Sequence, residues 1–353
     1  MKLHKIGIRV DGNGQIGMGH IFQQIQLGMY LKERLNSEIF FMTNREKIIE
    51  SLAKKFSLFH WNFLPQNIKP AESLKLFESW ADSQSFNTAL YDITDPYPEL
   101  KQNPALFTSI ERMRKKGLAT LAIELMNTKK LNTDVVINGS LVEDWHTYHK
   151  SKNTEYYLGP EYVILNPVYE NLHLKKRRIR NAVSQIFVCM GGSDPSNITR
   201  KVLKTLSELK LNFKITVVLG PAYDEQAATE LTKLPITGNF LIRNVSWRIW
   251  EHMLECDLAI ASAGRMPYEL CATGTPSLII PIVKHQEHTA EAFQSQCAAI
   301  NLTSSFKTTL GDKLQTLMVN KTLRMEMSIK GKQLVDGRGL KRIARIISSL
   351  HKR

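Results

Sequence analysis

The stretch IGIRVDGNGQIGMGHIFQQIQLGMYL (residues 6–31) joins an apolar run of strand length to a helix-like segment through a loop that contains four glycines. Alternating apolar residues in the first part predict a buried strand, and the apolar spacing over residues 22–35 predicts a helix. Glycines after a strand either only turn the chain or let a ligand approach the backbone, where the following helix start offers unpaired amides. The stretch is therefore the first strand, loop and helix of an α/β unit, and its loop is a candidate pocket floor.

The same alternation of strand-length and helix-like segments continues along the chain. Further strands are predicted at residues 39–43, 88–93, 119–125 and 134–138, with helices at residues 45–55 and 106–116. Residues 143–157 show no clear pattern. A second unit starts at residue 184, with strands at residues 184–190, 214–220, 239–245, 257–263 and 276–282 and a helix at residues 198–209. This pattern predicts two doubly wound parallel sheets, whose strand-end loops meet in a shared cleft.

Composition agrees with two globular domains, because 353 residues with 43% hydrophobic and 23% charged residues exceed the usual size of one core. We expect an N-terminal domain at residues 1–170, a second domain at 180–335 and a C-terminal helix at 336–353. Neither an apolar run of membrane-spanning length nor a signal peptide is present, which predicts a cytoplasmic protein. The four cysteines form no C-x-x-C pair, and we expect no metal site and no cofactor.

The formal charge of +14 favours an anionic partner. The densest basic segment is LKKRRIR (residues 174–180), which we interpret as a solvated linker; a weak membrane-surface role is the alternative, because basic clusters attract anionic lipid. No aromatic platform or recognised module accompanies this segment, so we expect no nucleic-acid partner.

Three loops that follow strands contain candidate ligand-binding residues. The first ends in Gly17, Gly19 and His20, and the near-neutral pKa of histidine suits it to take a proton from water or a hydroxyl, although a histidine at a helix start is often only a cap. The second, CMGGSDPSN (residues 189–197), precedes a helix start that could accept an anion. The third runs from Ser262 through Glu269, whose carboxylate could bind a ribose diol or only favour the helix start.

The motifs IRVDGNGQIGMGH, LGPEYVILNP, FVCMGGSDPSN, ASAGRMPYELCATGTP and LVDGRGLKRIARII together resemble the pseudaminic-acid pathway UDP-sugar hydrolases and their spore-coat polysaccharide relatives. That family belongs to the superfamily of the peptidoglycan UDP-N-acetylglucosamine transferase, so the resemblance implies a GT-B fold of two Rossmann-like domains. It implies cleavage of a UDP-linked 2,4-diacetamido-trideoxyhexose at its anomeric carbon, without metal and with inversion, for pseudaminic acid or surface polysaccharide synthesis.

The resemblance also implies residue roles, with His20 as the catalytic base. Substrate-binding residues would be Asp11, Gly17, Gly19, Gln23 and Asn166. UDP-binding residues would be Gly191, Gly192 and Ser193 near the phosphates, Asn244 and Val245 near the uracil, Ser262 and Gly264 near the diphosphate, Glu269 on the ribose, and Gln286.

Several positions depart from that family. Gln23 and Asn166 replace arginines, YDITDPY around Asp92 replaces an Asp-His-Tyr-Gly motif, and Ile123 and Glu124 replace paired aspartates. An altered sugar or an acceptor other than water therefore stays open. The first hypothesis is a hydrolase, the second is an inverting glycosyltransferase that acts on a cell-surface glycan or lipid, and the third is a non-catalytic nucleotide-sugar-binding protein.

Overall fold

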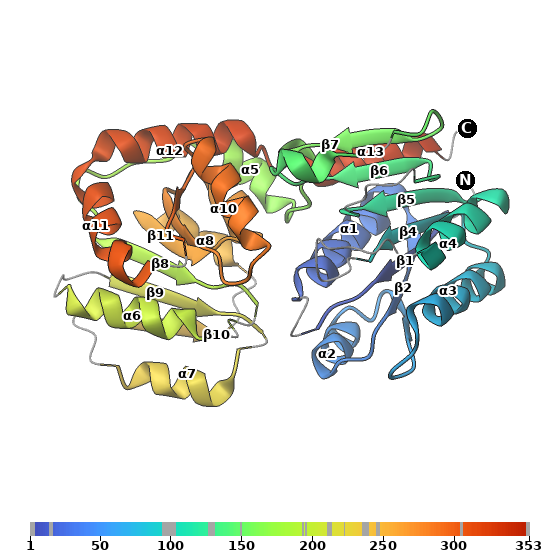
Figure 1. Cartoon of the computed structure of the whole chain (residues 1–353), viewed down its shortest axis with the longest axis horizontal. Coiled ribbons are helices and arrows are strands. Elements are labelled where there is room, and N and C mark those ends of the chain that lie inside the picture. Colours follow the sequence, from blue (N-terminus) through green and yellow to red (C-terminus); the bar gives the residue numbers. More distant parts are fainter. Residues whose placement is uncertain are drawn as a thin grey trace. The chain divides into compact units, whose positions relative to one another are not determined.

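The computed structural model describes residues 4–13, 17–93, 104–125, 131–148, 150–192, 194, 196–209, 214–221, 223–234, 240–244, 248–303 and 306–350. The chain divides into two compact units. Unit 1 comprises residues 1–167 together with 338–353, and unit 2 comprises residues 168–337 (Figure 1).

Unit 1 is built on a parallel sheet with the strand order β3-β2-β1-β4-β5-β6-β7. Its strands are β1 (His4–Val10), β2 (Ser37–Thr43), β3 (His60–Phe63), β4 (Thr88–Asp92), β5 (Ala119–Ile123), β6 (Val135–Asn138) and β7 (Glu155–Leu158). Its helices are α1 (Gly19–Leu35), α2 (Lys47–Lys55), α3 (Pro70–Gln84), α4 (Pro104–Lys115) and α13 (Gly339–Leu350), with short 3-10 turns η1 (Glu143–His146) and η2 (Pro160–Tyr162).

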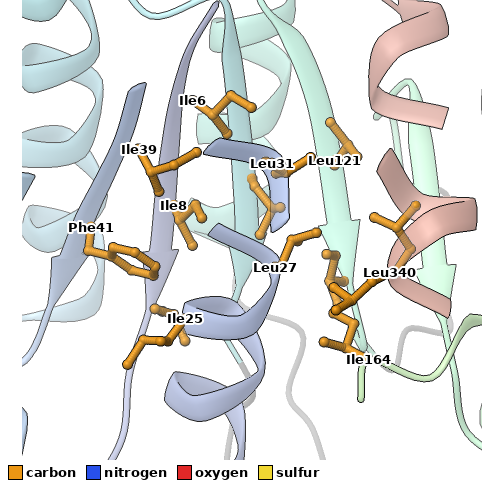
Figure 2. Packing of buried hydrophobic residues seen from close by; sticks show 14 of the residues in the cluster. Ile6, Ile8, Ile25, Leu27, Leu31, Ile39, Phe41, Leu121, Ile164 and Leu340 are labelled. Carbon is orange, nitrogen blue, oxygen red and sulfur yellow. The ribbon is translucent and has the colours of Figure 1, made fainter. Parts of the chain in front are cut away.

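Alternation along the strands of unit 1 supplies a separate hydrophobic core on each face of the sheet. Ile39 and Phe41 of β2 pack with α1, α2 and α13, whereas Phe40 and Met42 pack with α3 and α4. Figure 2 shows the first of these cores, in which residues of α1 lie over β1 and β2. The doubly wound arrangement follows from this alternation, since each buried face of the sheet needs helices to cover it.

The C-terminal helix α13 belongs to unit 1, although it follows all of unit 2 in the sequence. Its buried residue Leu340 lies in the core beside Ile164 and Leu27 (Figure 2). A Cβ on Gly339 would lie 2.0 Å from the carbonyl oxygen of Val163, so the returning chain passes against the segment that leaves unit 1.

Unit 2 contains a parallel sheet with the order β10-β9-β8-β11-β12-β13. Its strands are β8 (Gln185–Cys189), β9 (Lys214–Leu219), β10 (Phe240–Asn244), β11 (Leu258–Ser262), β12 (Ser277–Ile280) and β13 (Ile300–Asn301). Its helices are α5 (Val168–Leu174), α6 (Ile198–Glu208), α7 (Glu225–Thr232), α8 (Ile249–Glu255), α9 (Met266–Thr273), α10 (Gln286–Ser295), α11 (Phe306–Val319) and α12 (Lys321–Leu334).

One expectation about the connecting segments is wrong. Residues 143–157 are not structureless, because they contain η1 and most of β7. The basic segment at residues 174–180 is exposed at Lys175, Lys176 and Arg178, as expected of a solvated linker. Arg177 differs, because it donates to the carbonyl oxygens of Met253 (2.7 Å) and Leu254 (3.2 Å), where α8 ends.

Arg180 also binds the segment that follows α8, because it forms an ion pair with Asp257 at 2.7 Å. Guanidinium groups at a helix C-terminus satisfy orphan carbonyls and oppose the negative end of the dipole. Two of the arginines that made the segment look like a lipid-binding patch therefore stabilise unit 2 itself.

Candidate active site

The predicted base His20 lies at the point where the winding direction of the unit 1 sheet reverses. Strands β2 and β3 lie on one side of β1, and β4 to β7 lie on the other. His20 is the second residue of α1, which follows β1, and Asp92 is the last residue of β4, which pairs with Val10 of β1. Ligands of open α/β sheets bind at such reversal points, at the carboxyl ends of the strands.

His20 and Asp92 form a close pair. The ring Nδ1 of His20 lies 2.8 Å from Oδ1 of Asp92, whose side chain is fully buried, whereas 19% of the histidine side chain is exposed. An ionised carboxylate only accepts hydrogen bonds, so Nδ1 of His20 must be the donor. The tautomer that results carries its lone pair on Nε2, as a general base requires.

Gln24 completes the support of this pair from the same face of α1, four residues after His20. Its Nε2 donates to Oδ2 of Asp92 at 2.7 Å, and the glutamine is fully buried. Both oxygens of the Asp92 carboxylate are therefore engaged, which fixes the plane of the carboxylate and the direction of the His20 ring.

Glu124 brings a second carboxylate to His20 from the end of β5. Its Oε2 lies 3.9 Å from Nδ1 of His20 and 3.5 Å from Nε2 of Gln23. Glu124 has a left-handed backbone with φ of 52°, which is uncommon for a residue with a side chain. Such backbone strain is found where the surrounding structure holds a functional group in place.

Asp11 has a different environment from the one its predicted substrate-binding role suggests. Its carboxylate accepts two hydrogen bonds from the Arg9 guanidinium, at 2.6 and 2.8 Å, and one from the backbone amide of Asn44 at 3.0 Å. Asn44 in turn bonds the backbone of Gly12 through both ends of its amide. These contacts tie the loop after β1 to the loop after β2.

The glycine loop has two positions whose geometry demands glycine. Gly17 has φ of 82°, and a Cβ on Gly12 would lie 2.8 Å from a side-chain carbon of Ile21. Gly19 is the first residue of α1. Gly12 therefore lies against the first turn of the helix that carries His20.

The predicted phosphate residues of unit 2 also meet where the winding of their sheet reverses, between β8 and β11. Gly191 has φ of 83°, and a Cβ there would lie 3.2 Å from the hydroxyl of Ser262. Gly192 follows in the same turn. A Cβ on Gly220, after β9, would lie 2.2 Å from the carbonyl oxygen of Gly191, so this third glycine is required for the loop to fit.

At the start of α6 the protein's own Asp194 bonds the backbone amides. Asp194 accepts hydrogen bonds from the amides of Ile198 at 2.7 Å and Thr199 at 2.8 Å. These are first-turn amides, which an outside phosphate would otherwise bind. Burial raises the pKa of Asp194, although the amides oppose the shift. The turn is held by the protein's own carboxylate.

Gly264 and Gln286 lie close together between β11 and α10. A Cβ on Gly264 would lie 3.2 Å from Nε2 of Gln286, while Oε1 of Gln286 accepts from the amide of Ile282 at 3.0 Å. Gln286, the first residue of α10, thus holds the backbone between β12 and α10 and lies beside Gly264, which precedes α9. The helix start that follows Gly264 is the remaining candidate for the diphosphate.

Glu269 lies in the first turn of α9 and is partly buried. Burial raises its pKa from 4.5 to about 7, against the opposing effects of a hydrogen bond from Tyr169 and the charge of Arg265. With a pKa of about 7, the Glu269 carboxyl is about half ionised at neutral pH. Hydrogen bonds donated by a ribose diol would favour the ionised form, which only accepts hydrogen bonds.

The roles of four further predicted residues stay predictions. Ser193 and Val245 lie outside the described residues, as does the side chain of Asn244, whose backbone ends β10. Asn166 lies in unit 1 just before the chain enters unit 2.

Sequence reasoning assigned no role to Asp92, Gln24 or Glu124, which the fold brings to His20. Asp92 and Glu124 were visible only as departures from the related family. The signal that could have found them is position, because both stand where predicted parallel strands end. Gln24 could have been found from its spacing of four residues from His20 on a helix.

The two sheets and their loops define a GT-B fold, as predicted. The crystal structure of MurG from Acinetobacter baumannii is similar with a TM-score of 0.67 over 98% of this chain and 99% of that protein, at 14% identity. Residues 186–342 match the glycosyltransferase family 28 C-terminal domain.

Two curated relatives extend the similarity. The chain is 27% identical to the spore coat polysaccharide biosynthesis protein SpsG of Bacillus subtilis, over 98% of both chains. It is 26% identical to the pseudaminic acid cytidylyltransferase and UDP-2,4-diacetamido-2,4,6-trideoxy-beta-L-altropyranose hydrolase of Helicobacter pylori, over 45% of this chain and 28% of that protein. Together these findings support a glycosyltransferase-like protein related to nucleotide-sugar enzymes of polysaccharide biosynthesis.

Within the described residues, no helix is both long and apolar enough to cross a bilayer.

Proposed function

We propose that this protein hydrolyses a UDP-linked 2,4-diacetamido-trideoxyhexose at its anomeric carbon and releases UDP and the free sugar. The observation that carries the proposal is the His20–Asp92 pair, at 2.8 Å, at the reversal point of the unit 1 sheet. The relative from Helicobacter pylori, whose name includes hydrolysis of such a UDP-sugar, supports the choice of reaction.

In the proposed reaction His20 acts on water. Nε2 of His20 takes a proton from the water as its oxygen bonds to the anomeric carbon, and the bond from that carbon to the UDP oxygen breaks with its electron pair on UDP. Attack from the side opposite to UDP inverts the anomeric configuration. Asp92 stabilises the imidazolium that forms and keeps Nδ1 protonated throughout.

Residues of unit 2 would bind the UDP leaving group. The family 28 match covers these loops, from β8 to the start of α13. Backbone amides near Gly191 and Gly264 would stabilise the charge that develops on the diphosphate. The Glu269 carboxylate would accept hydrogen bonds from the two ribose hydroxyls, and these bonds would favour its ionised form.

A glycosyltransferase is the second candidate, favoured by the family 28 match and by the relative from a polysaccharide pathway. His20 would then deprotonate an acceptor hydroxyl in place of water, and the same bond to UDP would break. Exposed cations such as Lys175, Lys176 and Arg178 would attract an anionic or membrane-bound acceptor.

One assay separates the candidates. The purified protein is incubated with UDP-sugars, including the 2,4-diacetamido-trideoxyhexose derivative, without and then with glycan or lipid acceptors, and UDP and free sugar are measured. UDP release in water alone supports the hydrolase, and release only with an acceptor supports the transferase. Tight UDP-sugar binding without turnover under either condition would contradict both and support a non-catalytic binding protein.

A further inference from the structure

Four apolar side chains of unit 2 are strongly exposed to solvent. Val319 is 79% exposed, Leu174 68%, Ile329 54% and Met325 44%, which are the highest values for large apolar residues in the part of the chain that the structure describes. Single exposed apolar residues are ordinary in folded proteins, whereas a group of them on one surface marks an interaction site. The four residues therefore matter if the fold brings them together.

The basic segment at residues 174–180 runs along α12. Near the end of α12, Lys332 donates to the carbonyl oxygen of Lys175 at 2.5 Å. At the start of α12, Lys321 donates to the side-chain oxygen of Asn181 at 2.6 Å. Figure 1 shows α5, which leads into the segment, next to one end of α12. The segment and the helix therefore lie side by side, with opposite directions.

Two of the exposed apolar residues lie on the side of α12 that borders this segment. Met325 stands four residues after Lys321, and Ile329 stands three residues before Lys332. These are the spacings of neighbours on one helix face. The exposed acid of α12, Glu326, is five residues from Lys321 and six from Lys332, so it lies on another side of the helix.

The other two apolar residues extend this line at both ends. Val319 ends α11 just before α12 starts, and Leu174 ends α5 directly before the residue whose carbonyl oxygen Lys332 binds. We use the name α12 surface for these four apolar residues together with the exposed cations Lys175, Lys176 and Arg178.

We propose that the α12 surface binds an anionic lipid bilayer. Cations beside exposed apolar side chains match the membrane interface, because the cations meet anionic headgroups while the apolar groups enter the boundary of the acyl chains. The three cations remain exposed, whereas Arg177 and Arg180 are bonded within unit 2. The inference goes beyond the proposed function, since it concerns where the protein binds and not which bond it breaks.

A second copy of this chain is a less suitable occupant of the α12 surface. In a two-fold interface a surface meets its own copy, so two sets of three cations would come together. Like charges brought together at an interface repel each other, and this repulsion opposes association. An anionic bilayer neutralises the same cations, so charge complementarity selects lipid.

Sedimentation with vesicles measures the proposed binding without any nucleotide sugar. The whole protein is mixed with vesicles of phosphatidylcholine alone, or of equal parts of phosphatidylcholine and phosphatidylglycerol, at low and at high salt. One variant removes apolar groups and combines Leu174→Ser with Ile329→Ser. A second variant removes charges and combines Lys175→Gln, Lys176→Gln and Arg178→Gln.

Each variant has a matched control at exposed positions elsewhere. Leu58→Ser with Leu76→Ser removes two exposed leucines of unit 1. A triple variant removes the same number of charges as the charge variant and combines Lys75→Gln, Lys204→Gln and Lys313→Gln. Urea unfolding checks that all four variants are folded.

The wild type should bind the anionic vesicles and not the neutral ones, and high salt should weaken this binding. The charge variant should bind about 100-fold less tightly, because each cation near an anionic surface contributes about fivefold. The apolar variant should bind about tenfold less tightly or weaker still. Both controls should stay within about threefold of the wild type.

The inference is overturned if the wild type binds neither kind of vesicle or binds both equally. It is also overturned if a control loses as much affinity as its matched surface variant, because net charge or non-specific adsorption would then explain the binding. Analytical ultracentrifugation tests the other occupant. A wild-type dimer that the apolar variant converts to monomers would assign the surface to a second copy and so contradict lipid binding there.

Discussion

Replacing Glu269 with glutamine should stabilise unit 2, and the gain should depend on pH. The folded protein holds the pKa of this carboxyl at about 7 against an ordinary value of 4.5, chiefly through burial. The folded state therefore binds its proton more tightly than the unfolded state, so wild-type stability falls as pH rises from about 4.5 through 7. Glutamine is neutral and can still accept a hydrogen bond from Tyr169.

The expected size follows from 1.36 kcal/mol per pKa unit. At pH 8 the Glu269→Gln variant should unfold with a free energy about 3 kcal/mol higher than the wild type, and the difference should shrink to about 1 kcal/mol at pH 5. This is a large part of the 5–15 kcal/mol that is typical of folded domains, so a denaturant titration resolves it.

Urea titrations of both proteins at several pH values, without ligand, measure the difference. Glu287→Gln, at an exposed glutamate in the first turn of α10, is the matched control and should follow the wild type within about 0.5 kcal/mol. A Glu269→Gln variant that is no more stable than the wild type at pH 8, or that gains the same amount at every pH, would refute the argument from burial.

Three further predictions concern the other groups of the site and the basic segment. His20→Ala should lower kcat by a factor of about 100 to 10,000 while UDP affinity stays unchanged, and an active alanine variant would exclude His20 as the base. Uridine, which has no titrating phosphate, should bind about tenfold more tightly at pH 8 than at pH 6 if only ionised Glu269, with its pKa of about 7, binds it, and a flat calorimetric profile would contradict this role. Arg177→Met should lower the free energy of unfolding by about 2–4 kcal/mol, because the carbonyl oxygens at the end of α8 lose their hydrogen bonds. The control Arg178→Met, at an exposed position, should lower it by less than about 0.5 kcal/mol in the same thermal or urea titration. Equal effects of the two substitutions would argue against the cap.

Most of the fold could be predicted because most of its strands are apolar runs and helix-like segments alternate with them. Strands β1, β2, β4 and β8 all lie where the sequence predicted them. The missed strands β3, β7 and β13 are short and at most partly buried, so they show no apolar run. The position of α13 on unit 1 could not be predicted, because it depends on contacts between residues far apart in the sequence.

The site was predicted less completely than the fold. Its first residue, His20, stands in a recognisable glycine loop, but its partner Asp92 comes from a strand 72 residues further along the chain. The environment of Asp11 was also invisible, because Arg9 and Asn44 compete with any ligand for its carboxylate only in the folded chain. Charge alone misled at Arg177, since composition does not show which cations cap helices.

The central claim is tested most directly by hydrolysis in ¹⁸O-labelled water. The purified protein is given the UDP-linked 2,4-diacetamido-trideoxyhexose without any acceptor, and both products are analysed by mass spectrometry before the anomeric oxygen exchanges. The account predicts one labelled oxygen on the anomeric carbon of the sugar and none in UDP, with the reaction lost in His20→Ala. Label in UDP, or no release of UDP until an acceptor is added, would contradict it.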